Sequence, residues 1–103
     1  MSEKLPYRLT KRAGKVLLKI RKADKILFGK INNAIIKICE NPHIGEMKKG
    51  DLKGFYSLDI FHQSSNYEIF YAIEEDENGN LIAVILIGPR ENFYAELKRY
   101  LGL

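Results

Sequence analysis

Two stretches in the first half of the chain repeat apolar residues with the period of one helical face. In the first stretch the residues at i, i+3, i+4 and i+7 are apolar, and lysines fill the opposite side. These apolar residues are Ala13, Val16, Leu17 and Ile20. The second stretch runs from Leu27 to Ile38, and Asn41-Pro42 stops it. Because only a few residues around a capping Asp24 separate the stretches, the pattern predicts an antiparallel helical hairpin.

After Pro42 the apolar period changes to two, which is typical of strands. Apolar and polar residues alternate over 56–60, and a second alternation covers 67–73. Asn78-Gly79 is a strong hairpin signal, and residues 81–87 after it are apolar at almost every position. A strand of that composition suits the centre of a sheet that is covered on both faces.

Short elements complete the order at both ends of the chain. Residues 7–10 predict an opening strand, and Thr10 is placed to cap the helix that follows. Phe93, Leu97 and Tyr100 mark a short last helix. The elements therefore follow the order strand, helix, helix, strand, strand, strand, helix.

This order predicts an α+β domain in which the N-terminal helical hairpin packs on a small, mainly antiparallel sheet of about four strands. We expect a single domain over residues 1–103, because a chain of 103 residues has room for one core. The stretch between the hairpin and the sheet is typical of a flexible basic connector. Its glycines are interleaved with Lys48, Lys49 and Lys53.

Charge divides unequally along the chain. The net charge is +4, but residues 1–30 hold ten Lys and Arg against two acids, whereas residues 61–103 hold three against seven. A basic segment of this kind is typical of a protein that binds nucleic acid or an acidic partner. With 46% hydrophobic and 29% charged residues, the chain has the composition of a folded protein rather than a disordered one.

Several classes of function are disfavoured by composition. The apolar runs are far shorter than the roughly 20 residues that a bilayer-spanning helix needs. Residues 1–6 hold no apolar stretch of signal-peptide length, so we expect a cytoplasmic protein. One cysteine, Cys39, and two histidines, His43 and His62, offer few soft ligands, so we expect neither a metal site nor another cofactor.

In order and spacing, these features resemble the RelE/ParE superfamily of toxins from type II toxin-antitoxin modules. The matching motifs, which run along almost the whole chain, are the hairpin closing on Asn41-Pro42, Lys48 with Gly54-Phe55-Tyr56, the segment 67–71, Ile87-Gly88-Pro89-Arg90, and Tyr94. The resemblance implies a growth-inhibiting toxin that a cognate antitoxin neutralises. RelE-like members cut mRNA in the ribosome without a metal, and ParE-like members inhibit DNA gyrase.

The chain departs from the RelE pattern at three positions. Ser57, Asp59 and Glu68 stand where that pattern has basic residues, whereas Arg90 and Tyr94 are retained. The retained Arg90 and Tyr94 and the basic connector support the first hypothesis, an endoribonuclease, namely an mRNA interferase acting on ribosome-bound mRNA. The three departures favour an alternative. The alternatives are a gyrase inhibitor of the ParE kind, or a catalytically inactive protein of the toxin fold that only binds a partner.

Metal-free RNA cleavage needs a base for the 2′-hydroxyl, an acid for the leaving oxygen and cations for the phosphate. Glu68 or His62 offers the base, and Tyr94 or His62 offers the acid. Arg90 and Tyr94 are four residues apart near the start of the last helix, so they share a face if both are helical. Arg90 can bind phosphate through two hydrogen bonds.

RNA-backbone binding is assigned to the three connector lysines, Lys48, Lys49 and Lys53. We expect Arg90 and Tyr94 to meet in an open, cation-rich hollow, whereas Ser57 and Asp59 are interpreted as plain surface. Under every hypothesis we expect an antitoxin partner, acidic and partly disordered, that folds over the basic helical hairpin.

Overall fold

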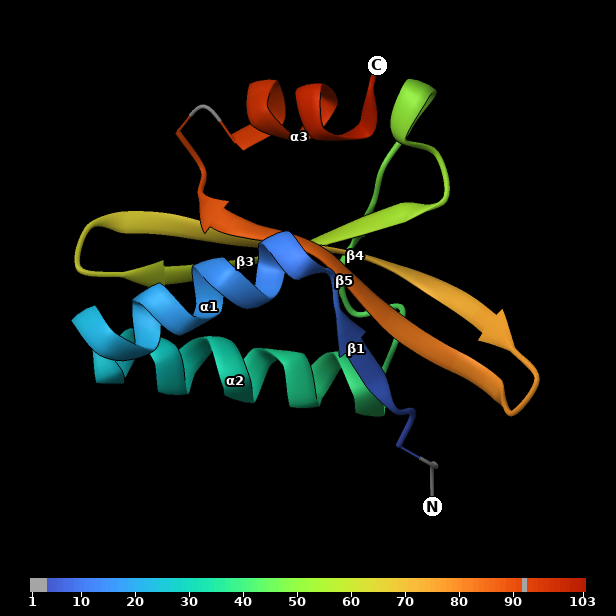
Figure 1. The fold of residues 1–103 in the computed structure, drawn as a ribbon, viewed down its shortest axis with the longest axis horizontal. Coiled ribbons are helices and arrows are strands. Elements are labelled where there is room, and N and C mark those ends of the chain that lie inside the picture. The colour runs from blue at the N-terminus through green and yellow to red at the C-terminus, as the bar shows by residue number, and fades with distance from the viewer. Residues whose placement is uncertain (1–3, 92) are drawn as a thin grey trace.

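The computed structural model describes residues 4–91 and 93–103. The N-terminal segment 1–6 therefore lies partly outside the described residues. A five-stranded mixed sheet separates two helical layers, with the hairpin of α1 and α2 on one face and α3 on the other (Figure 1). Within the described ranges, no helix is both long and apolar enough to cross a membrane.

The predicted hairpin is confirmed. Helix α1 spans Lys11–Ala23 and helix α2 spans Lys25–Glu40, so Asp24 alone separates them. The Thr10 side chain accepts the Ala13 N–H at the start of α1, and the Asp24 carboxylate accepts the Leu27 N–H at the start of α2. Both helices begin at side-chain caps, which satisfy backbone donors that a helix leaves free. The C-terminal helix α3 spans Phe93–Leu101.

The sheet has the strand order β1-β5-β4-β3-β2, and only the pairing of β1 with β5 is parallel. The strands span Tyr7–Leu9 (β1), Glu46–Met47 (β2), Phe55–His62 (β3), Ser65–Asp76 (β4) and Gly79–Pro89 (β5). The mainly antiparallel prediction is confirmed, and so is the hairpin turn at Asn78-Gly79. Strand β5 lies inside the sheet with residues 81–88 buried, as its apolar composition predicts.

The prediction of about four strands was one strand short, because the connector is ordered. It contains β2 and a short 3-10 helix over Gly50–Leu52. The N–H of Lys48 donates to the Phe55 carbonyl at 2.9 Å, which continues the β2–β3 ladder. A strand of two residues is too short to show an alternating pattern, so the sequence gives no sign of it.

A buried tyrosine fixes the path from α2 to β2. The Tyr71 hydroxyl donates to the Pro42 carbonyl at 2.7 Å and accepts the Gly45 N–H at 3.0 Å. A Cβ at Gly45 would lie 2.7 Å from that hydroxyl, so only glycine fits there. This anchor brings the chain back to the sheet edge directly before Glu46 and Lys48.

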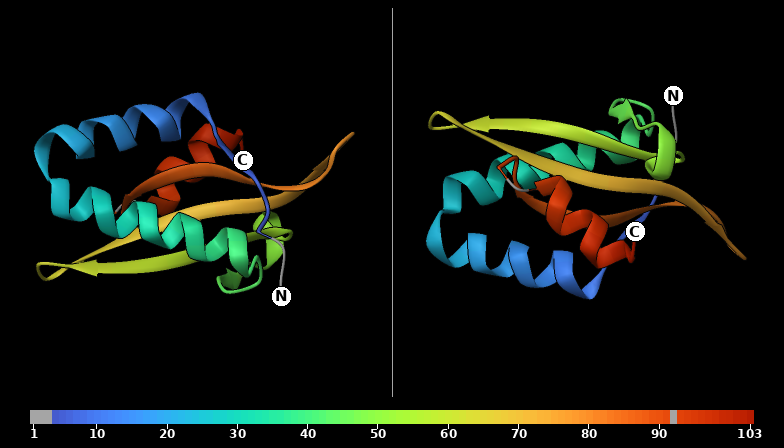
Figure 2. Two further views of the ribbon diagram at one scale, coloured as in Figure 1. Left: turned by 90° about the horizontal axis from the view of Figure 1, so that it is seen from below. Right: turned by 90° about the horizontal axis from the view of Figure 1, so that it is seen from above.

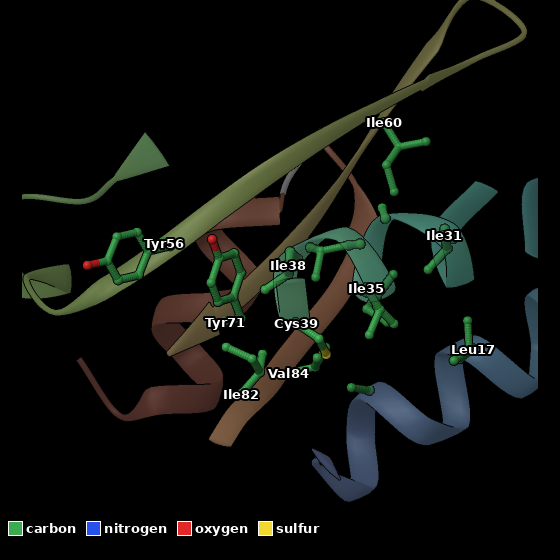
Figure 3. Close-up of a cluster of buried hydrophobic side chains, with 14 of the residues drawn as sticks. Leu17, Ile31, Ile35, Ile38, Cys39, Tyr56, Ile60, Tyr71, Ile82 and Val84 are labelled. Atoms are coloured by element: carbon green, nitrogen blue, oxygen red, sulfur yellow. The ribbon is translucent and has the colours of Figure 1, made fainter. Parts of the chain in front are cut away.

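Two apolar clusters hold the layers together. Between the hairpin and the sheet, side chains such as Ile31, Ile35 and Tyr71 are fully buried (Figure 3). On the opposite face, Phe93 and Leu97 of α3 pack in a second cluster with sheet residues of β4 and β5. Burial of apolar surface on both faces is the main source of stability in such a three-layer arrangement.

A β-bulge in β5 determines which side chains face α3 at its end. Phe70 pairs with Leu86 but Tyr71 pairs with Val84, so Ile85 is the extra residue. Ile85 and Leu86 both belong to the cluster on the α3 face. The alternation after them is shifted by one residue, and Gly88 lies against Phe93 on that same face.

Candidate functional site

A polar pocket of about 340 Å³ opens on the α3 face of the sheet, where β2, β3, β4 and the end of β5 meet. Its lining residues are Glu46, Lys48, Ser57, Leu58, Asp59, Glu68 and Arg90. Strand register explains why the polar lining residues of β2, β3 and β4 share a face, since Ser57 pairs with Glu46 and Asp59 pairs with Glu68. Directly paired residues in a sheet project to the same side.

Glu68 is the most buried polar residue of the pocket, with 2% of its surface exposed. Its Oε1 accepts a hydrogen bond from the Tyr94 hydroxyl at 3.0 Å. Its Oε2 is buried and has no hydrogen-bond partner among the residues that the structure describes. Burial raises the pKa of Glu68, and the neighbouring Asp59 adds to this while the Tyr94 hydrogen bond opposes it. A carboxyl with a raised pKa is suited to proton transfer near neutral pH.

Lys48 is the first cation of the pocket. Its ammonium lies 2.9 Å from Glu46 Oε1 and 5.0 Å from the centre of the Tyr94 ring. Burial acts to lower the pKa of Lys48, but the Tyr94 phenol and the Glu46 carboxylate outweigh burial and raise it. The same contact lowers the pKa of Glu46. Lys48 therefore carries a full positive charge beside Tyr94.

Arg90 is the second cation, and the backbone holds it in place. Its N–H donates to the Asn66 carbonyl at 2.7 Å, which extends the β4–β5 edge beyond the last ladder residue. Its Nη1 lies 3.6 Å from Asp59 Oδ2. The Asn66 amide, oriented with its oxygen toward Arg90, accepts from the same Nη1 at 3.2 Å. More than half of the Arg90 side chain remains exposed to solvent.

The pocket differs from the cation-rich hollow predicted from the sequence. Lys48 and Arg90 face three carboxylates, those of Glu46, Asp59 and Glu68. The sequence does not show which residues of neighbouring strands face each other. In the structure the register pairs Asp59 directly with Glu68, so their carboxylates lie in the same pocket.

Four of the seven predicted site residues lie together: Arg90, Tyr94, Glu68 and Lys48. Arg90 precedes α3 instead of belonging to it, so its closeness to Tyr94 comes from the β5–α3 turn and not from helical spacing. Lys49 and Lys53 are exposed beside the 3-10 helix and do not line the pocket.

His62 lies away from this pocket. It is 5% exposed at the end of β3, where even-numbered residues such as Ile60 pack against the hairpin. Its Nε2 lies 2.9 Å from Asp24 Oδ2 at the junction of α1 and α2. The structure thus gives His62 a contact between layers, on the opposite face of the sheet from Glu68.

Three pocket residues, Glu46, Ser57 and Asp59, were not among the site residues predicted from the sequence. Ser57 and Asp59 were interpreted as plain surface, yet both line the pocket and Ser57 is buried. The alternation over β3 carries the missing signal, because it places these two residues on the face opposite Tyr56 and Ile60. Glu46 and Lys48 are also two residues apart in an extended segment, so their side chains lie on the same side of the sheet edge.

The arrangement can take up a proton and bind an anion within one pocket. Glu68 presents an Oε2 without a partner in the described part of the chain, and Lys48 and Arg90 supply two positive charges. Tyr94 connects these parts, since its hydroxyl contacts Glu68 and its ring contacts Lys48. Within the described ranges, no three His, Cys, Asp or Glu residues are grouped so that they could hold a metal ion.

Solved structures of the same fold come from several bacteria. The YoeB/ParE toxin from Agrobacterium tumefaciens superposes with a TM-score of 0.72 and 21% identity over 84% of this chain and 99% of that one. The YoeB dimer from Staphylococcus aureus gives a TM-score of 0.65 and 23% identity, covering 84% and 97%. A chain of the toxin-antitoxin complex RelBE2 from Mycobacterium tuberculosis gives 0.62 and 19%, covering 85% and 100%.

Sequence comparison agrees with these folds. A RelE-like toxin protein from Escherichia coli is 28% identical over 71 residues, which is 69% of this chain and 70% of the relative. The family model of the ParE-like toxin of type II bacterial toxin-antitoxin systems matches residues 8–98. That match runs from β1 into α3 and includes every residue of the pocket. The chain therefore belongs to the ParE-like toxin family of type II toxin-antitoxin systems.

Proposed function

We propose that this toxin is a metal-independent endoribonuclease that cleaves mRNA, on the ribosome and in the cytoplasm. The observation that carries this proposal is the buried Glu68 carboxylate between two cations and a tyrosine, with one oxygen that no described residue contacts by a hydrogen bond. Burying a carboxylate without full hydrogen bonding destabilises the fold, so a function at this position is the better explanation.

In this mechanism Glu68 is the general base. Its Oε2 accepts the proton of the 2′-hydroxyl, and the 2′-oxygen attacks the adjacent phosphorus. The bond from phosphorus to the 5′-oxygen breaks, and Tyr94 donates its proton to that leaving oxygen. The products are a 2′,3′-cyclic phosphate and a 5′-hydroxyl. Rotation of the protonated Glu68 carboxyl then places its proton toward Tyr94, whose oxygen lies 3.0 Å from Oε1, and transfer to the phenolate restores both groups.

Lys48 and Arg90 bind the scissile phosphate and stabilise the charge that develops on its oxygens. Arg90 has Asp59 as its present partner at 3.6 Å, a distance longer than a good hydrogen bond. Phosphate offers the guanidinium two acceptors in parallel and can displace this weak ion pair. Lys48 also lies beside the Tyr94 ring, where its positive charge offsets the negative charge left on the phenolic oxygen after this proton transfer.

The second candidate is inhibition of DNA gyrase. It is favoured by the three carboxylates of the pocket, because their negative charge repels a polynucleotide. Two of them already form ion pairs with Lys48 and Arg90. In this case the pocket would be a site of protein–protein contact instead of RNA chemistry.

We further propose that the cognate antitoxin covers the outer face of the helical hairpin. Leu18 and Ile26 are 49% and 68% exposed there, beside the exposed lysines Lys19, Lys22 and Lys25. An acidic helical segment of the antitoxin would bury the two apolar side chains with its own apolar face. Its carboxylates would form ion pairs with the three lysines.

Induced expression followed by primer extension on translated messages tests the nuclease. New 5′ ends are expected in cells that express the wild-type protein. Glu68→Gln and Arg90→Ala are each expected to lower the yield of cut message by at least about 100-fold, the usual scale for loss of a general base or a phosphate clamp. Lys37→Ala, which removes an exposed cation of α2 outside the pocket, is the matched control and should cut normally.

Growth arrest with intact messages would contradict the proposal. In that case purified protein is added to a gyrase supercoiling reaction, and inhibition at micromolar protein would establish the second candidate. Circular dichroism of each variant separates loss of activity from loss of fold.

A further inference from the structure

Two shallow hollows adjoin on the side of α3 that faces α1. One, of about 240 Å³, is lined by Arg12, Glu96, Arg99 and Tyr100. The other, of about 320 Å³, is lined by Lys11, Arg12, Lys15 and Tyr100. They share Arg12 and Tyr100, so they form one surface, which we name the basic patch. Both views of Figure 2 show the start of α1 close to the end of α3.

The basic patch surrounds an exposed aromatic ring with cations. Tyr100 is 43% exposed, although it is a large side chain on a packed helix. Lys11, Arg12, Lys15 and Arg99 are all exposed, and none of them forms an ion pair within the part of the chain that the structure describes. Glu96 is the one carboxylate in the lining, so four cations and one anion leave a formal charge of +3.

This charge opposes the stability of α1. The first turn of α1 contains no acidic residue and begins with Lys11 and Arg12, at the positive end of the helix dipole. Lys11 and Lys15 are also like charges at i and i+4, which repel each other. The arrangement is thus unfavourable for folding by itself, and an anionic ligand would remove both penalties.

We propose that the basic patch binds single-stranded RNA through its phosphodiester backbone, with one base stacked on Tyr100. Cations that follow a backbone beside an exposed aromatic ring are the common way in which proteins bind single strands. The two arginines can each bind a phosphate through paired hydrogen bonds. An acidic protein would use the same cations but has no need of a bare tyrosine ring at their centre.

Helix α3 connects the patch with the pocket. Tyr94 lies in the first turn of this helix at the pocket, and Tyr100 lies in its last turn at the patch, six residues later. Six residues span about 9 Å along a helix axis. An RNA strand that is cut beside Glu68 can therefore continue across α3 to the basic patch. The identification of the ligand as RNA rests on the proposed function. The patch would hold the message at a point away from the scissile bond.

The test measures binding of a fluorescent 12-nucleotide single-stranded RNA by anisotropy, with the full chain carrying Glu68→Gln so that cleavage does not interfere. Adding Tyr100→Ala is expected to weaken binding about tenfold, the scale of one lost stacking contact. Adding Arg12→Glu is expected to weaken it by at least as much. The same Arg12→Glu change should raise the melting temperature by a few degrees, because it places an acid at the helix N-terminus.

Lys22→Glu is the matched control. It changes the charge by the same amount on the same helix, but in the last turn, far from the patch. RNA affinity should change less than twofold, and the melting temperature should fall because a cation in the last turn is favourable. If Arg12 and Lys22 acted only on folding, the more stable variant would not bind RNA more weakly. A gain in melting temperature together with a loss of affinity for Arg12→Glu therefore indicates a direct contact with RNA.

Equal losses of affinity for Arg12→Glu and Lys22→Glu would overturn the proposal, since they would indicate general attraction to a basic protein. Normal binding by Tyr100→Ala would overturn it as well. If RNA does not bind but a decaglutamate peptide binds in a patch-dependent way, the surface takes an acidic protein instead. Patch-dependent RNA binding without cleavage by the wild-type protein would refute the nuclease and leave the patch in place.

Discussion

Glu68 holds a carboxyl group where ionisation and folding oppose each other. It is nearly inaccessible, one of its oxygens has no partner in the described part of the molecule, and burial raises its pKa. Buried polar groups are usually hydrogen-bonded, and an ionisable group without a full set of partners is especially unfavourable. The residue therefore lowers stability in exchange for a reactive group, as is common in active sites.

Glu68→Gln should stabilise the protein at neutral pH. Because the folded pKa of Glu68 lies above its unfolded value, the wild-type protein loses stability as pH rises through that folded pKa. Glutamine cannot ionise and still accepts the Tyr94 hydrogen bond. The variant should gain on the order of 1 kcal/mol at pH 7 and much less at pH 4, where Glu68 is protonated in the folded state and mostly protonated in the unfolded state.

Urea unfolding of both proteins at pH 4 and pH 7 measures this difference. Asp51→Asn, an exposed acid outside the pocket, is the control and should show no pH-dependent gain. An equal effect of Glu68→Gln at the two pH values would show that ionisation of Glu68 is not the cause.

Residue chemistry could be predicted in part. Glu68, Arg90 and Tyr94 were identified as candidates and the structure brings them together, whereas Asp59 was not, although it faces Glu68 across the ladder. His62 attracted attention because its ordinary pKa lies near neutrality. Its actual neighbour, Asp24, is 38 residues away in sequence, and no local pattern reveals such a contact.

Elements were predicted more completely than the site, because helical and strand periods are local. The bulge at Ile85 shows the limit of that reasoning. Residues 81–87 are apolar at every position, so the sequence cannot reveal where the alternation shifts. Without the extra residue, Gly88 and the Arg90 that follows would face the hairpin instead of α3.

Asp24 links three elements and should be needed for stability. It is the C-cap of α1 and the N-cap of α2, and its second oxygen contacts His62 of β3. The Leu27 N–H and then His62 lower the pKa of Asp24, so its contribution is present above its ordinary value and disappears as pH falls through the lowered one. Asp24→Ala should reduce the free energy of unfolding at pH 7 by an amount typical for the loss of a helix N-cap.

Chemical denaturation at pH 7 measures the loss, and Asp24→Asn is the matched control. Asparagine caps helices about as well as aspartate, so it should retain most of the stability. If Asp24→Asn lost as much as Asp24→Ala, the charge beside His62 would be the important contact and the cap would not.

At the scale of the whole molecule, charge is divided between two regions. Helix α1 and its flanks carry the basic excess, and the hairpin of β4 and β5 ends in the acidic run 74–77 (Figure 1). Such a division orients an approaching polyanion before any contact forms. The division of charge is visible in the sequence. Only the fold shows that the basic start of α1 lies beside α3, where the basic patch forms.

Salt dependence should separate the cations that contact RNA from those that only attract it. Each phosphate neutralised on a single strand contributes about 0.7 to the slope of log affinity against log salt. Arg12→Gln should therefore reduce the slope by about 0.7, because a specific contact and its released counterion are lost. Lys22→Gln should leave the slope unchanged and lower affinity only slightly, through the weaker long-range field. Anisotropy titrations of the same RNA at four salt concentrations give both slopes, and identical slopes for the two variants would mean that the basic patch makes no direct phosphate contact.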